Sequence, residues 1–265
     1  MKRAVAAGRG APAKPLSAYV LHQYDWSETS LIVELFTRER GRLAVAAKGA
    51  KRPYSQLRGV LLPFQRLQVT LARGGDDAEV HTLRGAEWAG GAAMPSGGAL
   101  FPGFHLNELL LRLLARQDPH PGLFDAYAQL LPRLAAADEA GSQAVLRAFE
   151  LILLRETGLL PELDSVTLTL QPVRTDARYL LQAEVGIAAA PDGDAALTGA
   201  QWVALQAALA HGSVDALCAA CAPALPALRG SLRVLLQYHL GSQRLRTRQV
   251  MADLRRLLDP RVSPR

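Results

Sequence analysis

Hydrophobic and polar residues alternate in five short segments of the first third of the chain. Side chains two positions apart share one face of a β-strand, so alternation rich in β-branched and aromatic residues predicts strands. The segments cover residues 17–25, 29–37, 42–48, 64–72 and 79–84. Gly41 provides a turn before the third segment, GGDD at 74–77 forms a hairpin-like break, and one short helix fits between the third and fourth. Five closely connected strands predict a small closed barrel, for which the OB-fold is the best-known solution. The pattern alone leaves an SH3-like barrel open.

The period changes to three and four after residue 98, which is typical of amphipathic helices. Leu106, Leu109 and Leu110 begin the first helical pattern, and further helices are predicted at about 122–135 and 142–157, with Gly158 as a C-terminal cap. Short β-like pieces follow at 166–171 and 178–183, and then helices at about 199–210, 213–220, 224–240 and 247–258. The predicted fold is α+β with two domains: an N-terminal five-stranded OB-fold barrel followed by a mostly α-helical C-terminal domain. The expected boundaries are a flexible basic tail at 1–16, the OB-fold nucleic-acid-binding domain at 17–88, a linker at 89–98, a helical domain at 99–258 with a short β-hairpin insertion near 166–183, and a tail at 259–265.

Charge is distributed unevenly over the 265 residues, whose formal net charge is +6. Residues 1–84 hold 14 Lys and Arg against 7 Asp and Glu, residues 85–230 hold 8 against 15, and residues 231–265 hold 8 against 2. A basic beginning, an acidic middle and a basic end indicate parts with different tasks, and the basic parts favour an anionic partner.

The most basic stretch is RERGRLAVAAKGAKRPYSQLR at 38–58, with seven cations against one carboxylate, Glu39. Leu43, Val45 and Ala47 share one face of the predicted strand, which leaves the other face with charge at both ends. We therefore expect a β platform with a basic surface that binds a nucleic acid backbone. A charged face that only maintains solubility is the alternative. The side chains expected to contact the nucleic acid are Arg38, Arg40, Arg42, Lys48, Lys51, Arg52, Arg58 and Arg66.

Two aromatic residues near this stretch, Tyr54 and Phe64, could stack on bases, although core or barrel-closing positions explain them more simply. Near the C-terminus Arg244, Arg246 and Arg248 form a second basic group. This group is consistent with contact to phosphate or to an acidic protein tail, and equally with the preference for cations near the end of a helix.

Most catalytic and metal-binding patterns are missing from the sequence. Cys218 and Cys221 have metal or redox spacing, but a structural zinc site needs four ligands, and two small buried residues on one helix face explain the pair. The histidines are scattered, and no P-loop, GxSxG or dinucleotide-binding pattern occurs. The acids Glu150, Glu156, Glu162 and Asp164 are expected at helix surfaces or at a helix exit. We expect no catalytic residue, metal or cofactor, no signal peptide or membrane segment, and a cytoplasmic, nucleoid-associated protein.

Four segments between about 17 and 255 carry a resemblance to a known family: AYVLHQYDWSETSLIVELFTRERGRLAVAAKGAKRPYSQLRGVLLPFQRLQVTL, LFPGFHLNELLLRLLARQDPHPGLFDAYAQLL, LRAFELILLRETGLLPELD and YHLGSQRLRTRQVM. Through these segments the chain as a whole resembles the RecO family, the bacterial recombination mediators of gap repair. Many members carry four zinc-binding cysteines after the GLLPELD segment. Here SVTLTLQPVRTDARYLLQ occupies that place without a cysteine, so the chain is similar to a zinc-free branch.

The resemblance implies an N-terminal OB-fold, a helical C-terminal domain and a non-enzymatic role. That role is to bind single- and double-stranded DNA, to anneal complementary strands, and to act with RecR in loading RecA onto DNA coated by single-strand binding protein. The acidic C-terminal tail of the coating protein would dock on the helical domain. An apolar groove edged by arginines suits such a tail, and Arg112, Arg116 and Arg133 are the candidates by that logic.

In this interpretation the basic side chains neutralise phosphates without reading sequence, which lowers the repulsion between two strands. Reversal of Lys51 and Arg52 to Glu should then weaken DNA binding and leave the fold intact. An RNA-binding OB-fold protein of translation or ribosome assembly and a metal-dependent nuclease remain the alternatives.

Overall fold

A computed structural model describes residues 14–72, 78–91, 94–190, 196–241, 245–247, 249–250 and 253. Its N-terminal part is a closed five-stranded barrel with the strand order β1-β2-β3-β5-β4. The strands are β1 (Leu16–Asp25), β2 (Leu31–Thr37), β3 (Gly41–Ala47), β4 (Arg66–Leu71) and β5 (Val80–Trp88), and the short helix α1 (Gln56–Val60) lies between β3 and β4. Only β3 and β5 pair in parallel; the other pairs are antiparallel. The barrel confirms the predicted fold class, and the break predicted at GGDD lies outside the described residues.

Alternating side chains fill the barrel interior as the pattern predicted. Val33, Leu35, Leu43, Val45 and Leu67 belong to one buried cluster inside the barrel. Two glycines lie at chain turns that need positive φ: Gly41 opens β3 with φ +66°, and Gly158 follows the end of α4 with φ +71°. Gly158 donates its N–H to the Arg155 carbonyl, which confirms the predicted helix cap.

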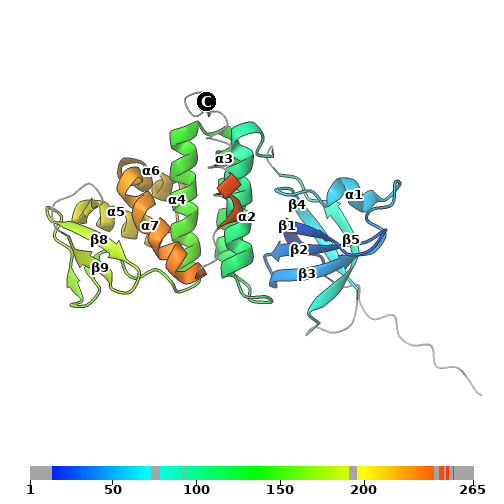
Figure 1. The fold of residues 1–265 in the computed structure, drawn as a ribbon, viewed down its shortest axis with the longest axis horizontal. Coiled ribbons are helices and arrows are strands. Elements are labelled where there is room, and N and C mark those ends of the chain that lie inside the picture. Colours follow the sequence, from blue (N-terminus) through cyan, green and yellow to red (C-terminus); the bar gives the residue numbers. More distant parts are fainter. Residues whose placement is uncertain are drawn as a thin grey trace, which may run out of the picture.

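The second part of the chain is mainly helical (Figure 1). It contains the 3-10 turn η1 (Gly97–Ala99) and the helices α2 (Leu100–Leu113), α3 (Pro121–Ala136) and α4 (Glu139–Glu156), then α5 (Gly199–His211), α6 (Val214–Cys221), the 3-10 turn η2 (Ala222–Ala224) and α7 (Leu225–Leu240). Asp138 caps α4, and Thr198 with Gln201 forms a capping box on α5. The last predicted helix, 247–258, lies mostly outside the described residues.

Short strands interrupt the helices between α4 and α5. The predicted strand at 166–171 is wrong: β6 (Ser165–Val166) and β7 (Gln171–Pro172) are two-residue strands that pair across a turn. The piece predicted at 178–183 is β8 (Arg178–Gln182), which pairs with β9 (Gly186–Ala189) and with β10 (Leu197–Thr198), neither of which was predicted. Two-residue strands are too short to show a period, so the pattern could not separate them.

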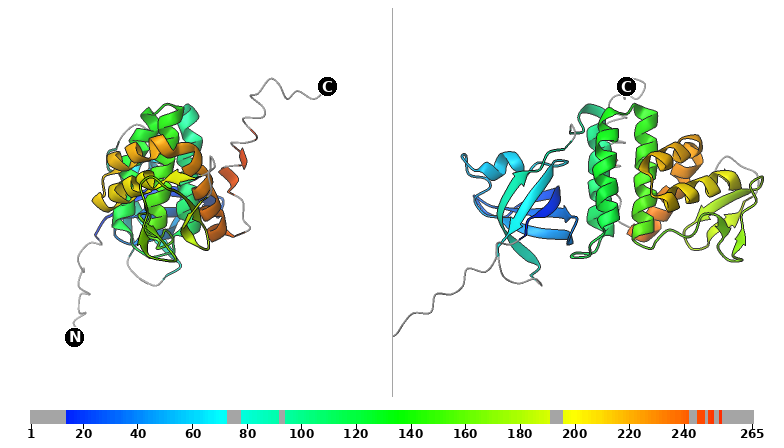
Figure 2. Two further views of the ribbon diagram at one scale, coloured as in Figure 1. Left: turned by 90° about the vertical axis from the view of Figure 1, so that its left-hand side faces the viewer. Right: turned by 180° about the vertical axis from the view of Figure 1, so that it is seen from behind.

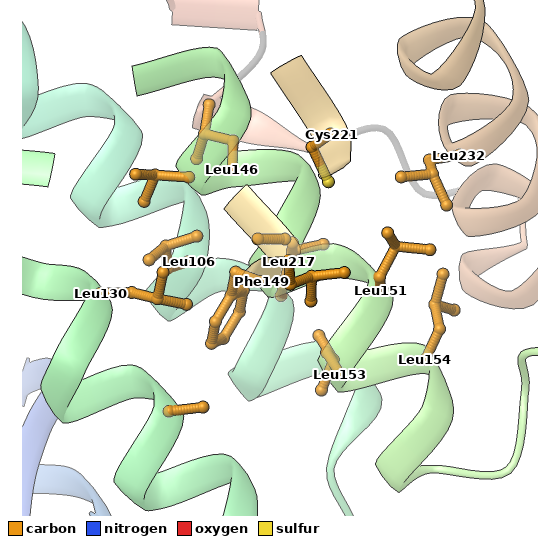
Figure 3. Packing of buried hydrophobic residues seen from close by; sticks show 14 of the residues in the cluster. Leu106, Leu130, Leu146, Phe149, Leu151, Leu153, Leu154, Leu217, Cys221 and Leu232 are labelled. Carbon is orange, nitrogen blue, oxygen red and sulfur yellow. The ribbon is translucent and has the colours of Figure 1, made fainter. Parts of the chain in front are cut away.

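The main hydrophobic core lies among the helices and reaches the barrel. Leu106, Leu130, Phe149, Leu217 and Cys221 point into one packed region between four helices (Figure 3). The same cluster includes Tyr19, Leu21, Phe36 and Phe64 from the barrel. Helices α2 and α3 therefore cover one outer side of the barrel, and the right-hand view of Figure 2 shows the helices beside it. In the described part of the chain, no helix is long and apolar enough to cross a membrane.

Candidate nucleic-acid interface

The outer side of β1, β2 and β3 is covered by the helices. Tyr19 and Phe36 pack on Phe124 with ring centroids 5.3 Å apart in both pairs. Ala44 and Ala46, on the outer face of β3, are only 1% and 4% exposed. The expectation that this face of β3 is an open basic surface is therefore wrong. The connection between α2 and α3 contacts the start of this face, where the Gln117 N–H donates to the Arg42 carbonyl at 2.9 Å.

Two of the predicted DNA contacts hold the barrel against the helices. The Arg38 guanidinium donates to both carboxylate oxygens of Asp125, at 2.9 and 2.8 Å. Arg42 is half-buried and donates to the backbone carbonyl of Leu111; burial lowers the pKa of its guanidinium. Both cations are committed to contacts within the chain, on the side of the barrel that faces the helices.

Arg40 and Arg66 lie toward the same side of the barrel. Arg40 is half-buried in the turn between β2 and β3, where its backbone N–H donates to Thr37. Arg66 begins β4 opposite Tyr19, and its charge acts on the Asp125 carboxylate of α3. The Arg66 side chain therefore lies on the side of the barrel that faces the helices, and Arg40 lies in the turn next to Gly41, which approaches Asp118 of the helical part.

The opposite end of the barrel is formed by two connections, the turn 26–30 between β1 and β2 and the segment 48–55 between β3 and α1 (Figure 1). We call this region, residues 24–30 and 48–58, the distal end. The Lys51 backbone N–H donates to the Thr29 carbonyl at 3.0 Å, and its ammonium lies 3.0 Å from an Asp25 carboxylate oxygen and 3.2 Å from the Ser27 carbonyl. Lys51 therefore ties the two connections together.

Exposed cations lie on the same connection as Lys51. Lys48, Arg52 and Arg58 are exposed, whereas Lys51 is half-buried. Lys51 and Arg58 also border a hollow of about 310 Å³. Its remaining lining residues are Gln23, Leu31, Ala50, Leu57 and Leu61. An apolar floor with a cationic rim suits a sugar-phosphate chain, because the cations can pair with phosphates while sugars or bases cover the apolar atoms.

The distal end also exposes aromatic rings. Tyr54 is 97% exposed, so its predicted position in the core is wrong, while Trp26 is 57% exposed and Tyr24 48%. Phe64 is buried against Phe104 of α2, as its core interpretation predicted. Sequence reasoning missed Trp26, although a large aromatic residue within the polar turn WSETS is itself a signal.

The C-terminal basic group is only partly described, because Arg244 and Arg248 lie outside the described residues. Arg246 is exposed, and its backbone N–H donates to Glu108 of α2 at 2.8 Å. Thr247 adds a backbone and a hydroxyl hydrogen bond to the same carboxylate. Burial alone would raise the pKa of Glu108, but these hydrogen bonds and the charge of Arg112 outweigh it and lower the pKa. Glu108 thus anchors the C-terminal segment on α2.

The three arginines expected to edge a partner groove lie apart from one another. Arg112 pairs with Glu108, and Arg116 reaches back to Glu34 of the barrel. Arg133 pairs with Asp215 at 2.6 Å. Of these three, only Arg133 lies next to a hollow between α3, α4 and the α5–α6 connection. The structure therefore does not bring the three together as one groove.

One acid differs from its predicted position. Glu150 was expected on a helix surface but is fully buried. Its carboxylate lies 2.9 Å from Arg147 and 3.3 Å from His105. Buried charges are stable only when paired, and the partner His105 lies 45 residues away, beyond the reach of a local pattern.

Cys221 is buried, and burial raises the pKa of its thiol, whereas Cys218 is half-buried. No group of three or more potential metal ligands occurs among the described residues.

The fold defines a protein with an N-terminal OB-fold barrel and an attached helical domain. Two family models match the chain: "Recombination protein O N terminal" over residues 15–92 and "Recombination protein O C terminal" over residues 96–249. Among curated relatives, DNA repair protein RecO of Variovorax paradoxus is 55% identical over 250 residues, and that of Acidovorax ebreus is 54% identical over 252 residues. Both alignments cover 91% of this chain and 96% of the relative. The chain belongs to the RecO family.

Proposed function

We propose that this protein binds DNA through the distal end of its barrel and acts in DNA repair as a strand-annealing recombination mediator. The observation that carries the proposal is a hollow on the OB-fold barrel that Lys51 and Arg58 border, with Lys48 and Arg52 exposed on the same connection. The relatives named DNA repair protein RecO support a role in repair.

Annealing follows from charge neutralisation, without an active site. Two complementary strands repel each other through their phosphates, and a protein that neutralises phosphates on both lowers this repulsion. Contacts to phosphate carry no sequence information, so the protein would accept any pair of complementary strands. Bound this way, the protein needs no catalytic residue, metal or cofactor.

The proposed role includes three protein partners. The protein would act with RecR, bind the acidic C-terminal tail of single-strand binding protein, and so promote loading of RecA onto the coated strand. For the tail we propose the hollow of about 250 Å³ between α3, α4 and the α5–α6 connection. Ile152, Leu209 and Leu217 supply apolar lining. Arg155, which also donates to the Leu209 carbonyl, and the neighbouring Arg133, which is paired with Asp215, supply positive charge for the tail's acids.

Acids on the rim of this hollow determine which part of the tail can enter. Asp125 is already paired with Arg38, whereas Glu156 lines the hollow near Gly122. An acidic tail should therefore place its apolar residues at the floor and its carboxylates toward Arg133 and Arg155. Arg133→Glu should weaken binding of a labelled tail peptide more than Arg112→Glu, and equal effects would count against this hollow.

The alternatives of RNA binding in translation and of nuclease activity receive less support. The relatives carry a DNA repair name, which favours DNA. A nuclease of the metal-dependent type needs convergent carboxylates.

The proposal is tested by annealing of two complementary oligonucleotides, one of them labelled, with and without single-strand binding protein coating both strands. We expect the protein to accelerate annealing of naked and coated strands, and Arg133→Glu to lose acceleration only on coated strands. No acceleration of naked strands would overturn the annealing role.

A further inference from the structure

The distal end exposes more aromatic surface than the fold requires. Trp26 and Tyr54 are 57% and 97% exposed, and no ring of the described residues stacks on either. Tyr24, by contrast, packs edge-on against His22 with centroids 4.5 Å apart. Exposed tryptophan and tyrosine rings contribute little to the core, so these two positions point to a ligand.

The turn that carries Trp26 is linked by hydrogen bonds within itself and to the next connection. The backbone N–H groups of Trp26 and Ser27 both donate to the Ser30 carbonyl at 3.3 Å, and the Ser30 N–H donates to the Ser27 hydroxyl at 3.2 Å. The Gly49 N–H donates to the Ser30 hydroxyl at 3.4 Å, and the Lys51 ammonium donates to the Ser27 carbonyl. The two rings therefore extend from connections that are hydrogen-bonded to each other.

The charges around the two rings favour a polyanion. The segment 48–58 contributes Lys48, Lys51, Arg52 and Arg58, whereas the turn contributes the acids Asp25 and Glu28. Asp25 is paired with Lys51 at 3.0 Å. The net charge of these six groups is positive. The ligand that covers the rings should therefore be anionic, such as a chain of phosphates, rather than uncharged and apolar.

We propose that Trp26 and Tyr54 form a stacking site for unpaired nucleobases, each ring taking one base of a strand whose phosphates lie along Lys48, Arg52 and Arg58. This inference rests on the proposed DNA binding and adds to it a contact that distinguishes single-stranded from double-stranded DNA. Bases of a duplex are stacked and paired inside the helix, so their faces cannot reach the rings. The site therefore strengthens binding of single strands and leaves duplex binding to the cations alone.

The magnitude of the effect follows from stacking energies. Base–aromatic stacking contributes about 1–3 kcal/mol per base, which corresponds to roughly 5- to 150-fold in affinity. Loss of a ring changes no charge, so the dependence of affinity on salt should stay the same. These two properties separate a stacking ring from a phosphate-binding cation.

The test compares full-length Trp26→Ala and Tyr54→Ala with the wild type by fluorescence anisotropy. Three labelled probes of equal length are used: a thymidine oligonucleotide, an oligonucleotide of abasic sites with the same number of phosphates, and a duplex. Trp88→Ala is the matched control, because Trp88 is 64% exposed but lies on β5 rather than on either connection. Circular dichroism and thermal unfolding confirm that each variant is folded.

We expect the wild type to prefer the thymidine probe over the abasic probe, and each variant to lose roughly 5- to 150-fold on the thymidine probe alone. Trp88→Ala should behave as the wild type on all three. Equal wild-type affinity for the thymidine and abasic probes would overturn the stacking site and leave DNA binding intact. Unchanged affinity in both variants would also overturn it. Failure of the wild type to bind any probe at low salt would instead overturn the proposed function itself.

Discussion

Arg38 at the end of β2 and Asp125 on α3 form a two-pronged ion pair that joins the barrel to the helices. The two residues are 87 positions apart, and their hydrogen bonds measure 2.9 and 2.8 Å. A planar guanidinium that faces a carboxylate with two parallel hydrogen bonds gives geometric specificity as well as attraction. The pair lies on the side of the barrel that faces the helical domain, away from the proposed DNA-binding end.

The first prediction concerns the role of Arg38. Arg38→Ala should leave DNA affinity and its salt dependence nearly unchanged, because this charge is already paired within the chain. Arg52→Ala, which removes an exposed cation of the distal end, should weaken binding. Equal losses in the two variants, measured by anisotropy with one labelled strand, would mean that DNA reaches the Arg38 side of the barrel.

The same pair predicts a pH dependence of stability. The hydrogen bond from Arg38 is the main cause that lowers the pKa of Asp125 in the folded protein. A lowered folded pKa means that the stabilisation is present above the unfolded pKa of about 3.9 and is lost as the pH falls through the folded value. Asp125→Asn should therefore reduce the urea midpoint at neutral pH and have no effect at the acid end, and the loss should shrink with salt.

A second prediction concerns the close approach of the two domains at Gly41. A Cβ atom there would lie 1.9 Å from the Asp118 carbonyl oxygen, and the backbone has φ +66°. Gly41→Ala should cost about 2–4 kcal/mol in the free energy of unfolding, from left-handed strain and from forced separation. Gly49→Ala is the matched control, because φ is +72° but the nearest atom to the new Cβ is 3.6 Å away. Its cost should be only about 1 kcal/mol, from backbone strain alone. Similar costs for the two variants would contradict the tight contact.

A third prediction concerns Asn107, a buried residue of α2 that links three elements. Its amide donates to the Val20 and Leu21 carbonyls, and its carbonyl accepts from the Tyr127 hydroxyl at 2.6 Å. Asn107→Ala leaves all three groups buried without this partner and should cost about 2–4 kcal/mol. Tyr127→Phe removes one donor and should cost about 1–2 kcal/mol. The double variant should cost less than the sum of the two, and strict additivity in urea unfolding would argue against the network.

A fourth prediction concerns the anchor of the C-terminal segment on Glu108. Glu108→Gln weakens the charge-assisted hydrogen bonds to Arg246 and Thr247, so hydrogen exchange of those two amides should accelerate roughly tenfold. Because the pKa of Glu108 is lowered in the folded protein, the anchor holds above the ordinary carboxyl pKa and is released as the pH falls through the folded value. Amides within α4 serve as the internal control. Equal acceleration there would point to global destabilisation instead.

Much of the architecture followed from period alone, because the strands alternate and the helices repeat at three and four. The periodicity did not predict that one outer face of the barrel is covered, because the residues that pack on this face belong to α2 and α3, which are distant in sequence. One signal was available: AYVL in β1 and LF in β2 are apolar at consecutive positions, which indicates strands buried on both faces. Tyr19 and Phe36 are the outward members of those runs, and both pack on α3.

The candidate site was predictable only in part for a similar reason. Charge density located the segment 38–58 but could not separate cations paired across the domain contact, such as Arg42, from exposed ones, such as Arg52. Lys51 shows the consequence most clearly. Its contacts to Asp25 and Ser27 hold the distal end together, so the Lys51 and Arg52 reversal expected to leave the fold intact would disturb the site it was meant to test. Arg52 and Arg58 make a cleaner pair.

The most direct test of DNA binding at the distal end is therefore a salt series with Arg52→Ala/Arg58→Ala, read by anisotropy of a labelled single strand. Each phosphate contact contributes a slope of about 0.7 in the plot of log affinity against log salt, so the double variant should bind more weakly and lose about 1.4 from the slope. Arg229→Ala/Arg233→Ala removes the same charge from exposed positions on α7 and should keep both the slope and the affinity of the wild type. An unchanged slope in the Arg52 and Arg58 variant would contradict the account, because the DNA would then lie elsewhere on the molecule.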